Sequence, residues 1–170
     1  MTRPLTSALL TAAILIALMV LGGCRDSADP TSTGLDAVPT LDRVDSSGLP
    51  ELAAGYTGWR QLNAEPIADD PEVPHGGRKD VFASVDEEDG TYPDGALVVK
   101  RGSQGDDPAG LVSVMLKVVN GNPQHGDWIF REYVRPRPDA AYTVLAENEA
   151  CWSCHDGAAD TDWVFTKADG

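Results

Sequence analysis

The chain has 170 residues and a formal net charge of −14. This length suffices for one domain with its own hydrophobic core. The strong negative charge argues against binding to nucleic acid or to anionic lipid surfaces, because both attract positive charge. It is compatible with a basic redox partner protein or simply with a well-solvated surface.

The N-terminal segment has the layout of an export signal. Residues 1–3 include Arg3, residues 5–20 are apolar, and residues 21–24 read Leu-Gly-Gly-Cys. This layout is typical of a signal peptide, and its end resembles a bacterial lipobox. We therefore expect a lipoprotein signal peptide over residues 1–23 and a lipid anchor on Cys24. The protein would then face the periplasm or the cell exterior, tethered to a membrane. An uncleaved transmembrane anchor is the alternative, although the apolar run is shorter than the roughly 20 residues a bilayer needs.

A polar segment follows the predicted signal. Residues 25–50 are rich in Ser, Thr, Asp, Gly and Pro, and their isolated Leu and Val residues show no sustained period. Such a composition is typical of flexible chain. The sequence therefore predicts a tether over residues 24–50 and one folded domain over residues 51–170.

The predicted domain begins with a helical pattern and continues with strands. Residues 50–63 have roughly helical apolar spacing, with Pro50 in the first turn, although Gly55 and Gly58 weaken the pattern. Four runs suited to β-strands follow, at residues 79–85, 96–101, 111–119 and 127–134. Turn sequences with Pro or Gly separate these runs, so we expect antiparallel pairing.

A second helix is predicted near the C-terminus, where Asp139 is placed to cap residues 140–145. The sequence as a whole therefore predicts a mainly β (α+β) fold. It consists of an antiparallel sheet of about four to five strands with flanking helices.

Residues 151–155, Cys-Trp-Ser-Cys-His, are the most informative motif. The C-x-x-C-H spacing is the attachment signature of a c-type haem. Each cysteine adds to one vinyl group of the porphyrin, and the histidine binds the iron. We therefore expect one covalent haem c on Cys151 and Cys154, with His155 as the proximal ligand. A zinc site or a redox disulfide is the alternative, but zinc normally takes four protein ligands, and the sequence has no second matching pair.

The sixth iron ligand has no obvious source. Beyond the predicted signal, the candidates are Met115, His75 and His125. Met115 lies in a hydrophobic strand, where core packing is the default, and both histidines lie in loop-like sequence. We therefore expect an open or weakly occupied distal face, which permits small-ligand chemistry.

Several sequence strings carry a family resemblance. They are residues 92–100 (YPDGALVVK), 114–117 (VMLK), 126–130 (GDWIF), the haem motif, and 162–166 (DWVFT). In this order they resemble the cytochrome P-460 and cytochrome c′-beta family. A weaker match begins near residues 56–59 and continues through His75 and Gly76.

The resemblance implies a largely β fold with a five-coordinate c-haem whose distal pocket binds hydroxylamine or nitric oxide. It also implies that the protein pairs as a homodimer. In cytochrome P-460 members a lysine is joined to the porphyrin rim, and Lys100 falls at that position. In cytochrome c′-beta members the ring is unmodified. From the sequence alone, Lys100 would more often be a solvated strand lysine.

Oxidation of hydroxylamine also needs a base within reach of the substrate. Glu132 alternates with Trp128 and Phe130 on one strand face, and Glu147 and Glu149 precede the haem motif, so each is a candidate. The resemblance places a basic pocket residue at Arg78 or Lys79. The aromatic residues that would wall the pocket or pack in the core are Phe82, Trp128, Phe130 and Tyr133.

Three functions remain open. The first is hydroxylamine oxidation by a haem joined to Lys100, with electrons passing to a redox partner protein. The second is nitric oxide binding without turnover, and the third is plain electron transfer through a six-coordinate haem. The resemblance favours them in that order.

Overall fold

The structure is a computed structural model that describes residues 38–70, 72 and 75–168. The predicted signal peptide, Cys24 and the first part of the predicted tether lie outside the described residues. Within the described part of the chain, no helix is long and apolar enough to cross a membrane.

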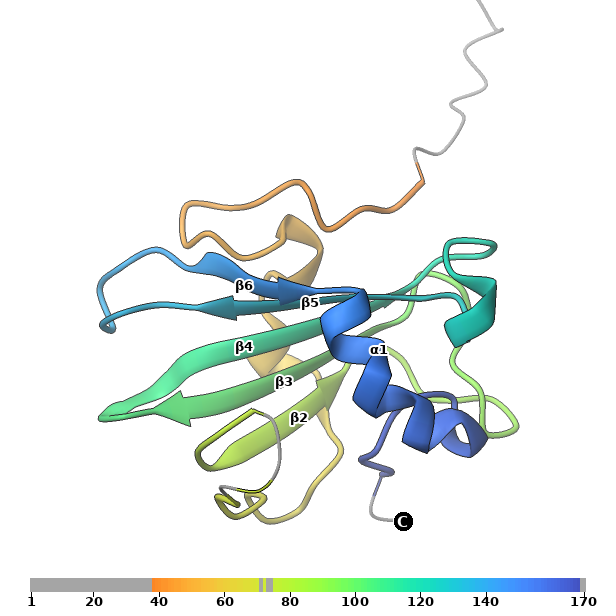
Figure 1. Cartoon of the computed structure of the whole chain (residues 1–170). Helices are drawn as coiled ribbons and strands as arrows, with labels where there is room; N and C mark the ends of the chain where they lie inside the picture. The colour runs from red at the N-terminus through yellow and green to blue at the C-terminus, as the bar shows by residue number, and fades with distance from the viewer. Residues whose placement is uncertain (1–37, 71, 73–74, 169–170) are drawn as a thin grey trace, which may run out of the picture. The chain divides into compact units, whose positions relative to one another are not determined.

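Six strands pair antiparallel, in chain order, to form one sheet in the described part of the chain (Figure 1). They are β1 (Arg60–Gln61), β2 (Lys79–Ala83), β3 (Leu97–Gln104), β4 (Asp107–Lys117), β5 (Trp128–Val134) and β6 (Thr143–Glu147). The predicted mainly β fold is confirmed, and the four predicted runs correspond to β2 through β5. One α-helix, α1 (Glu149–His155), follows β6. The short 3-10 helices are η1 (Glu51–Ala53), η2 (Tyr56–Gly58), η3 (Pro123–His125) and η4 (Asp156–Thr161).

The predicted helix over residues 50–63 is wrong. The chain forms only the two short turns η1 and η2 there, and then enters β1. Gly55, between the two turns, has a left-handed φ of 74°. Glycine adopts this conformation readily, and it interrupts the helical path that the apolar spacing suggested.

The predicted helix over residues 140–145 is also wrong. Thr143–Glu147 form β6, which pairs antiparallel with β5. Thr143 and Val144 are β-branched, which favours a strand, and Val144 and Leu145 are exposed. This segment therefore has no buried apolar face that would stabilise a helix, and it pairs with the edge of β5 instead.

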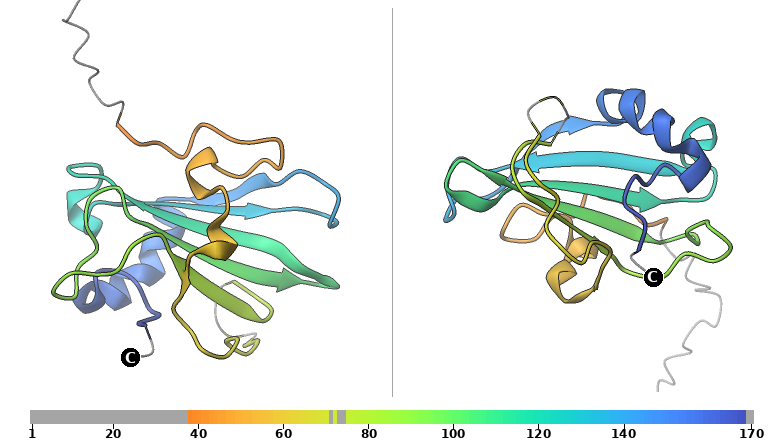
Figure 2. Two further views of the ribbon diagram at one scale, coloured as in Figure 1. Left: turned by 180° about the vertical axis from the view of Figure 1, so that it is seen from behind. Right: turned by 90° about the horizontal axis from the view of Figure 1, so that it is seen from below.

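The sheet has two buried faces, each with its own core. The N-terminal face packs against residues that precede β1, and the helix face lies under α1 and the C-terminal segment (Figure 2). Buried side chains of the N-terminal face include Leu41, Leu49, Tyr56, Phe82, Val99, Val112, Leu116 and Tyr133. Those of the helix face include Val81, Val98, Met115, Trp128, Phe130 and Val164. Successive strand residues alternate between the two faces, as the pleat requires.

The folded unit begins before the predicted boundary at residue 50. Leu41 and Leu49 are only 2% and 8% exposed and belong to the core of the N-terminal face. Val44 and Pro50 form an isolated β-bridge. Residues 38–50 are therefore part of the domain rather than of a flexible tether. Leu41 and Leu49 are buried by packing against the sheet, so the apolar residues of this segment show no period in the sequence.

Candidate haem site

A row of residues crosses the middle of the sheet on its helix face. Val81 of β2 pairs with Lys100 of β3, Lys100 with Ser113 of β4, and Ser113 with Glu132 of β5. Directly paired residues share one face of a sheet. The antiparallel register therefore brings Lys100, Ser113 and Glu132 together, although 32 positions separate the first from the last.

A cavity lies against this row. It has a volume of about 490 Å³, which is within the usual range for small-molecule and cofactor sites. Its walls include His75, Lys79, Lys100, Cys154, His155 and Phe165. A smaller adjoining hollow is lined by Ser113, Met115, Phe130, Glu132 and Cys151. The haem motif and the candidate residues of the sheet thus face the same space.

Helix α1 carries the motif to this space. It starts after Asn148, whose carbonyl accepts hydrogen bonds from the backbone N–H groups of Cys151 and Trp152. Cys151, Cys154 and His155 are spaced three and four residues apart, so they lie on one side of the helix. Cys151 is partly buried, Cys154 is exposed and His155 is buried. The three predicted attachment residues therefore border the cavity or its adjoining hollow.

The thiol of Cys151 is protonated at neutral pH. Its burial, followed by the negative charge of Glu132, raises the pKa of Cys151 to about 11. Zinc binds cysteine as a thiolate, so this environment opposes the zinc alternative. A neutral thiol in the hollow that adjoins the cavity fits thioether formation.

The imidazole of His155 is set up as a metal ligand. Its Nδ1 donates a hydrogen bond to the Trp163 carbonyl at 2.7 Å, which leaves Nε2 unprotonated and available. Burial lowers the pKa of His155, and the charges of Lys100 and His75 lower it further, while the bond to Trp163 opposes them. A neutral ring held through its other nitrogen is the usual arrangement of a metal-binding histidine.

The Trp163 carbonyl is itself held in place. Asp162 and Trp163 both have left-handed φ values, 52° and 61°. The buried Asp162 carboxylate accepts a hydrogen bond from the Tyr92 N–H at 2.8 Å and pairs with Lys117. A side chain at Gly126 would lie 2.3 Å from the Trp163 ring, so only glycine fits there. These contacts fix the C-terminal segment on the sheet and aim the carbonyl at His155.

Lys100 lines the cavity with a perturbed amine. Burial, followed by the positive charge of Lys79, lowers the pKa of Lys100 to about 8, while Glu132 acts in the opposite direction. A substantial fraction of the amine is therefore neutral near pH 8, and only a neutral amine is a nucleophile. A solvated strand lysine would not show this shift.

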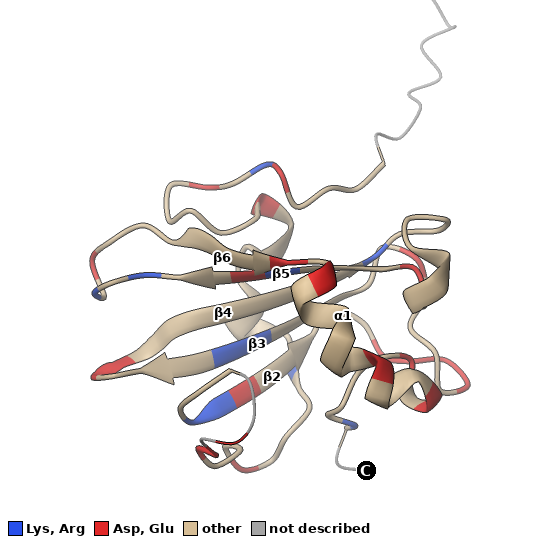
Figure 3. Cartoon of the chain, in the orientation of Figure 1, with Lys and Arg blue, Asp and Glu red and all other residues tan. Residues whose placement is uncertain are grey.

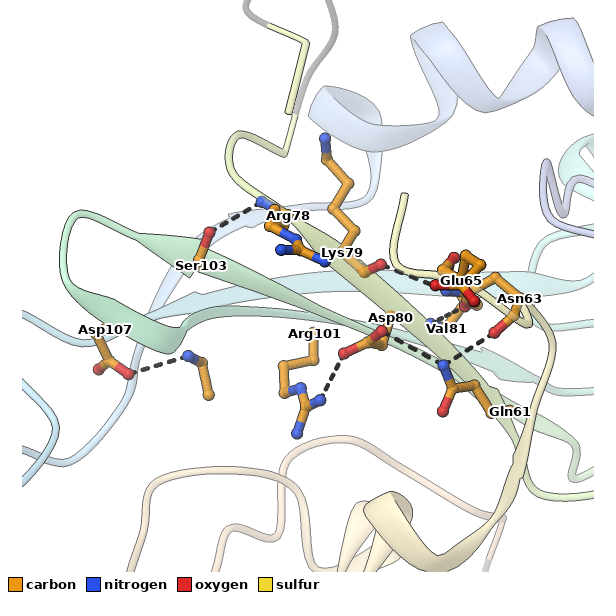
Figure 4. Close-up of polar contacts among 11 residues, drawn as sticks. Gln61, Asn63, Glu65, Arg78, Lys79, Asp80, Val81, Arg101, Ser103 and Asp107 are labelled. Atoms are coloured by element: carbon orange, nitrogen blue, oxygen red, sulfur yellow. Dashed lines mark hydrogen bonds and ion pairs between the residues drawn. The ribbon is translucent and has the colours of Figure 1, made fainter. Parts of the chain in front are cut away.

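Lys79 and Arg78, the two candidates for a basic pocket residue, differ in burial. Lys79 is 4% exposed and lines the cavity, whereas Arg78 is exposed. Figure 4 shows the Lys79 side chain on one side of β2, toward the translucent helix, and Asp80 and Arg101 on the other side. The structure therefore places Lys79 at the cavity.

The surroundings of the Lys79 ammonium group indicate whether the cavity suits a haem. Its Nζ is buried and has no hydrogen-bond partner in the described residues. An unpaired buried charge is costly, so the site fits a ligand that brings negative charge of its own. A haem carries two propionate carboxylates, and Lys79 would hold one of them. In Figure 3, blue segments of β2 and β3 lie beside α1.

Glu132 belongs to a polar cluster that the sequence did not reveal. Its carboxylate accepts hydrogen bonds from the Nδ1 of His75 and, at 3.2 Å, from the hydroxyl of Ser113. Burial raises the pKa of Glu132, but the bond to His75, that ring's charge, Ser113 and Lys100 together hold it below its usual value. Glu132 is therefore ionised at neutral pH. His75 lies in a loop 57 positions away, and no spacing rule connects the two.

The other candidate bases lie away from the cavity. Glu147 and Glu149 are exposed, and Glu147 pairs with Arg131 at 2.9 Å. His125, expected at the surface, is partly buried: it stacks on the Trp152 ring at 4.3 Å and binds Asp156.

The four aromatic residues proposed as pocket walls divide between the faces. Phe130 lines the site, and its ring centre is 4.9 Å from that of His155. Trp128 packs in the helix-face core, while Phe82 and Tyr133 are on the N-terminal face and do not line the cavity. The ring centre of Phe165 lies 5.3 Å from that of His155. Phe165 was not among the predicted wall residues.

The comparisons with known proteins agree with this geometry. The model of the family Cytochrome P460 matches residues 54–166, which is more than half of the chain. A search of the curated proteins found no match. The matched range spans the whole sheet, the buried Lys79 and Lys100, and the motif of α1. The chain therefore belongs to the cytochrome P460 family, whose members bind haem c.

Proposed function

We propose that this protein is a haem enzyme that binds and oxidises hydroxylamine, with haem c joined to Cys151 and Cys154 and His155 as the proximal ligand. The observation that carries this proposal is Lys100. Its amine is held partly neutral in the same cavity as the haem motif. A structural role does not require such an amine, whereas a bond to the porphyrin rim does.

Lys100 would be joined to the porphyrin ring. A new C–N bond replaces one N–H and one ring C–H bond, so two protons and two electrons leave. The electrons must pass to an external oxidant, such as a peroxide or molecular oxygen. The joined lysine distorts the macrocycle and changes its electron density, and both effects alter haem reactivity.

Glu132 would act as the base. It is ionised and partly buried, and it lines the hollow that adjoins the cavity, in the same row as Lys100. When bound, the haem supplies a binding point for the substrate nitrogen and a route for its electrons to an acceptor. Glu132 accepts a proton that hydroxylamine loses. Ser113 and His75 keep the carboxylate oriented through their hydrogen bonds.

The proposed oxidation is tested by turnover of hydroxylamine with an electron acceptor. We expect multiple turnovers in the wild type and loss of turnover in Lys100→Met, because the ring can no longer be joined. Lys167→Met is the control, since Lys167 is exposed. Wild-type protein that consumes no hydroxylamine, or a Lys100→Met variant with unchanged turnover, would contradict the proposal.

A second candidate function is nitric oxide binding in the manner of cytochrome c′-beta. It is favoured by the apolar lining of the adjoining hollow, which includes Met115, Phe130 and Val164 and suits a small uncharged ligand. In that case the ring would be unmodified and no turnover would occur. Multiple turnovers of hydroxylamine would eliminate this candidate.

We also propose that the protein is exported, anchored by lipid on Cys24, and coupled to a basic redox partner. The sequence of residues 1–24 and the net charge of −14 support this. Fractionation of cells tests the anchor: Cys24→Ser should leave the membrane fraction and become soluble, or remain in the membrane uncleaved. If the wild type is itself found in the cytoplasm, the proposed export is wrong.

A further inference from the structure

An ion pair is buried on the helix face, at the C-terminal end of β4. The side chains of Lys117 and Asp162 are 11% and 6% exposed, and the Lys117 Nζ donates a hydrogen bond to the Asp162 carboxylate. The other carboxylate oxygen accepts a hydrogen bond from the backbone N–H of Tyr92 at 2.8 Å. Neither Lys117 nor Asp162 lines the cavity or its adjoining hollow. A buried charge is costly unless it is paired, so each partner depends on the other.

The lysine is held on a rigid part of the sheet. Lys117 is paired with Trp128 of β5, and its backbone N–H donates a hydrogen bond to the Ala96 carbonyl at 2.9 Å. Its Nζ lies 5.1 Å from the centre of the Trp128 ring, and Trp128 is fully buried. The face of an aromatic ring attracts a cation in this position. The ammonium group is therefore fixed, and it fixes the Asp162 carboxylate in turn.

Asp162 immediately precedes the residue that holds His155. The carbonyl of Trp163 accepts the hydrogen bond from the Nδ1 of His155 at 2.7 Å. The φ values of Asp162 and Trp163 are 52° and 61°, and a left-handed conformation is uncommon for a residue as bulky as tryptophan. Strained backbone persists only where the surrounding contacts impose it. The buried ion pair supplies such a contact one residue from the carbonyl.

We propose that Lys117 and Asp162 are positioning residues for the proximal ligand of the haem iron. Their ion pair keeps the Trp163 carbonyl within hydrogen-bond distance of the His155 Nδ1. A hydrogen bond at that nitrogen raises the basicity of a histidine ligand, so His155 donates more electron density to the iron and stabilises the ferric state. These roles rest on the proposed ligation of the haem by His155, and they do not require oxidation of hydroxylamine.

Resonance Raman spectroscopy of the ferrous holoprotein measures the strength of the bond between iron and His155. We expect Asp162→Asn and Lys117→Met to lower the iron–histidine stretching frequency and to shift the reduction potential of the haem to a more positive value. Asp107→Asn is the matched control. The Asp107 side chain is also 6% exposed, pairs with Arg135 and accepts a hydrogen bond from a backbone N–H, but it lies outside the cavity and the hollow. This variant should lose stability without either change at the haem.

A double variant separates positioning from stability. Asp162→Asn and Lys117→Met each leave a buried charge without its partner, whereas the protein with both substitutions has no charge at this place. We expect the double variant to unfold at a higher urea concentration than either single variant, and to keep the lowered stretching frequency. The proposal would be overturned by a wild-type frequency in the folded single or double variants. An equal decrease in Asp107→Asn would overturn it as well.

Failure of these roles is distinguishable from failure of the proposed function. The stretching frequency is read without substrate, whereas oxidation is read from turnover and from the Lys100 bond. Wild-type frequencies in all variants of a protein that turns over hydroxylamine would refute only the positioning roles. A lowered frequency in Asp162→Asn, in a protein without turnover, would refute only the oxidation. An unchanged iron–histidine band in His155→Gly would refute both, because a different histidine would then be the ligand.

Discussion

The two faces of the sheet are made by the same strands and the same alternation of side chains, yet they differ in what they bury. The N-terminal face buries apolar residues, and its charged Arg101 is paired with Asp80. The helix face buries the His75–Glu132 pair and Lys79, whose Nζ has no hydrogen-bond partner in the described part of the chain, and Lys100 lies beside them. Apolar burial stabilises a fold by about 25 cal/mol per Å², whereas unpaired buried charge destabilises it. The N-terminal face therefore serves stability, and the helix face is built for a ligand.

The largest expected effect is loss of the haem, and it would sharpen the comparison between the two faces. Cys154→Ala removes one thioether site from α1, and we expect little or no normally attached haem in the purified protein. Haem staining of denatured protein and the absorption spectrum measure it. Ser153→Ala, in the same turn, is the control and should keep its haem. A fully loaded, normally coloured Cys154→Ala protein would show that the haem site is misassigned.

The next largest effect is expected from removal of the proposed base, Glu132. Glu132→Gln keeps the shape of the side chain but cannot accept a proton as a carboxylate does. We expect kcat for hydroxylamine to fall by about 10²- to 10⁴-fold, the usual contribution of a general base. Glu147→Gln is the matched control, because Glu147 is exposed and lies outside the cavity. Equal effects of the two substitutions would remove Glu132 from the mechanism.

A pair of neighbouring substitutions compares the faces directly. Leu116 and Met115 are adjacent on β4, both are buried, and they belong to opposite cores. Leu116→Ala and Met115→Ala should each lower the free energy of unfolding by about 2–5 kcal/mol. Only Met115→Ala, at the wall of the adjoining hollow, should change the haem spectrum. Urea unfolding measures the free energy of unfolding, and the absorption spectrum measures the change at the haem. A change in the haem spectrum of Leu116→Ala would contradict the division of roles between the two faces.

The smallest expected effect is a pH dependence. The pKa of Lys100 is lowered to about 8, so below that pH the neutral amine falls about tenfold per unit. In holoprotein that is not yet joined, the rate of bond formation to Lys100 should rise with pH and level off above about 8. Lys79→Met removes the neighbouring positive charge, which raises the pKa of Lys100 and moves the midpoint to higher pH. Mass spectrometry of timed samples measures the rate, and a pH-independent rate would contradict the role of the neutral amine.

The sequence predicted those parts of the fold that short-range patterns encode. The four runs that became β2 through β5 have β-branched residues bounded by turn signals, and α1 carries a motif whose chemistry fixes its spacing. The segment that became β6 was misassigned because its side chains are exposed and its conformation depends on the edge of β5. Residues 38–50 were misassigned because Leu41 and Leu49 are buried only by tertiary packing.

The site was predictable to a similar extent. Cys151, Cys154 and His155 were proposed from spacing and Lys100 from the family resemblance, and all four line the cavity or its adjoining hollow. The pairing of His75 with Glu132 and the burial of Lys79 depend on sheet register and on a loop that returns to the sheet. Such contacts have no local signature, so they appear only once the strands are paired.

The most direct test of the proposed enzyme is proteolysis of the holoprotein followed by mass spectrometry of the haem-bearing peptides. We expect a haem that is joined both to the peptide containing Cys151 and Cys154 and to a second peptide containing Lys100. Haem found on the cysteine peptide but never on a Lys100 peptide would contradict the account of a modified, hydroxylamine-oxidising haem.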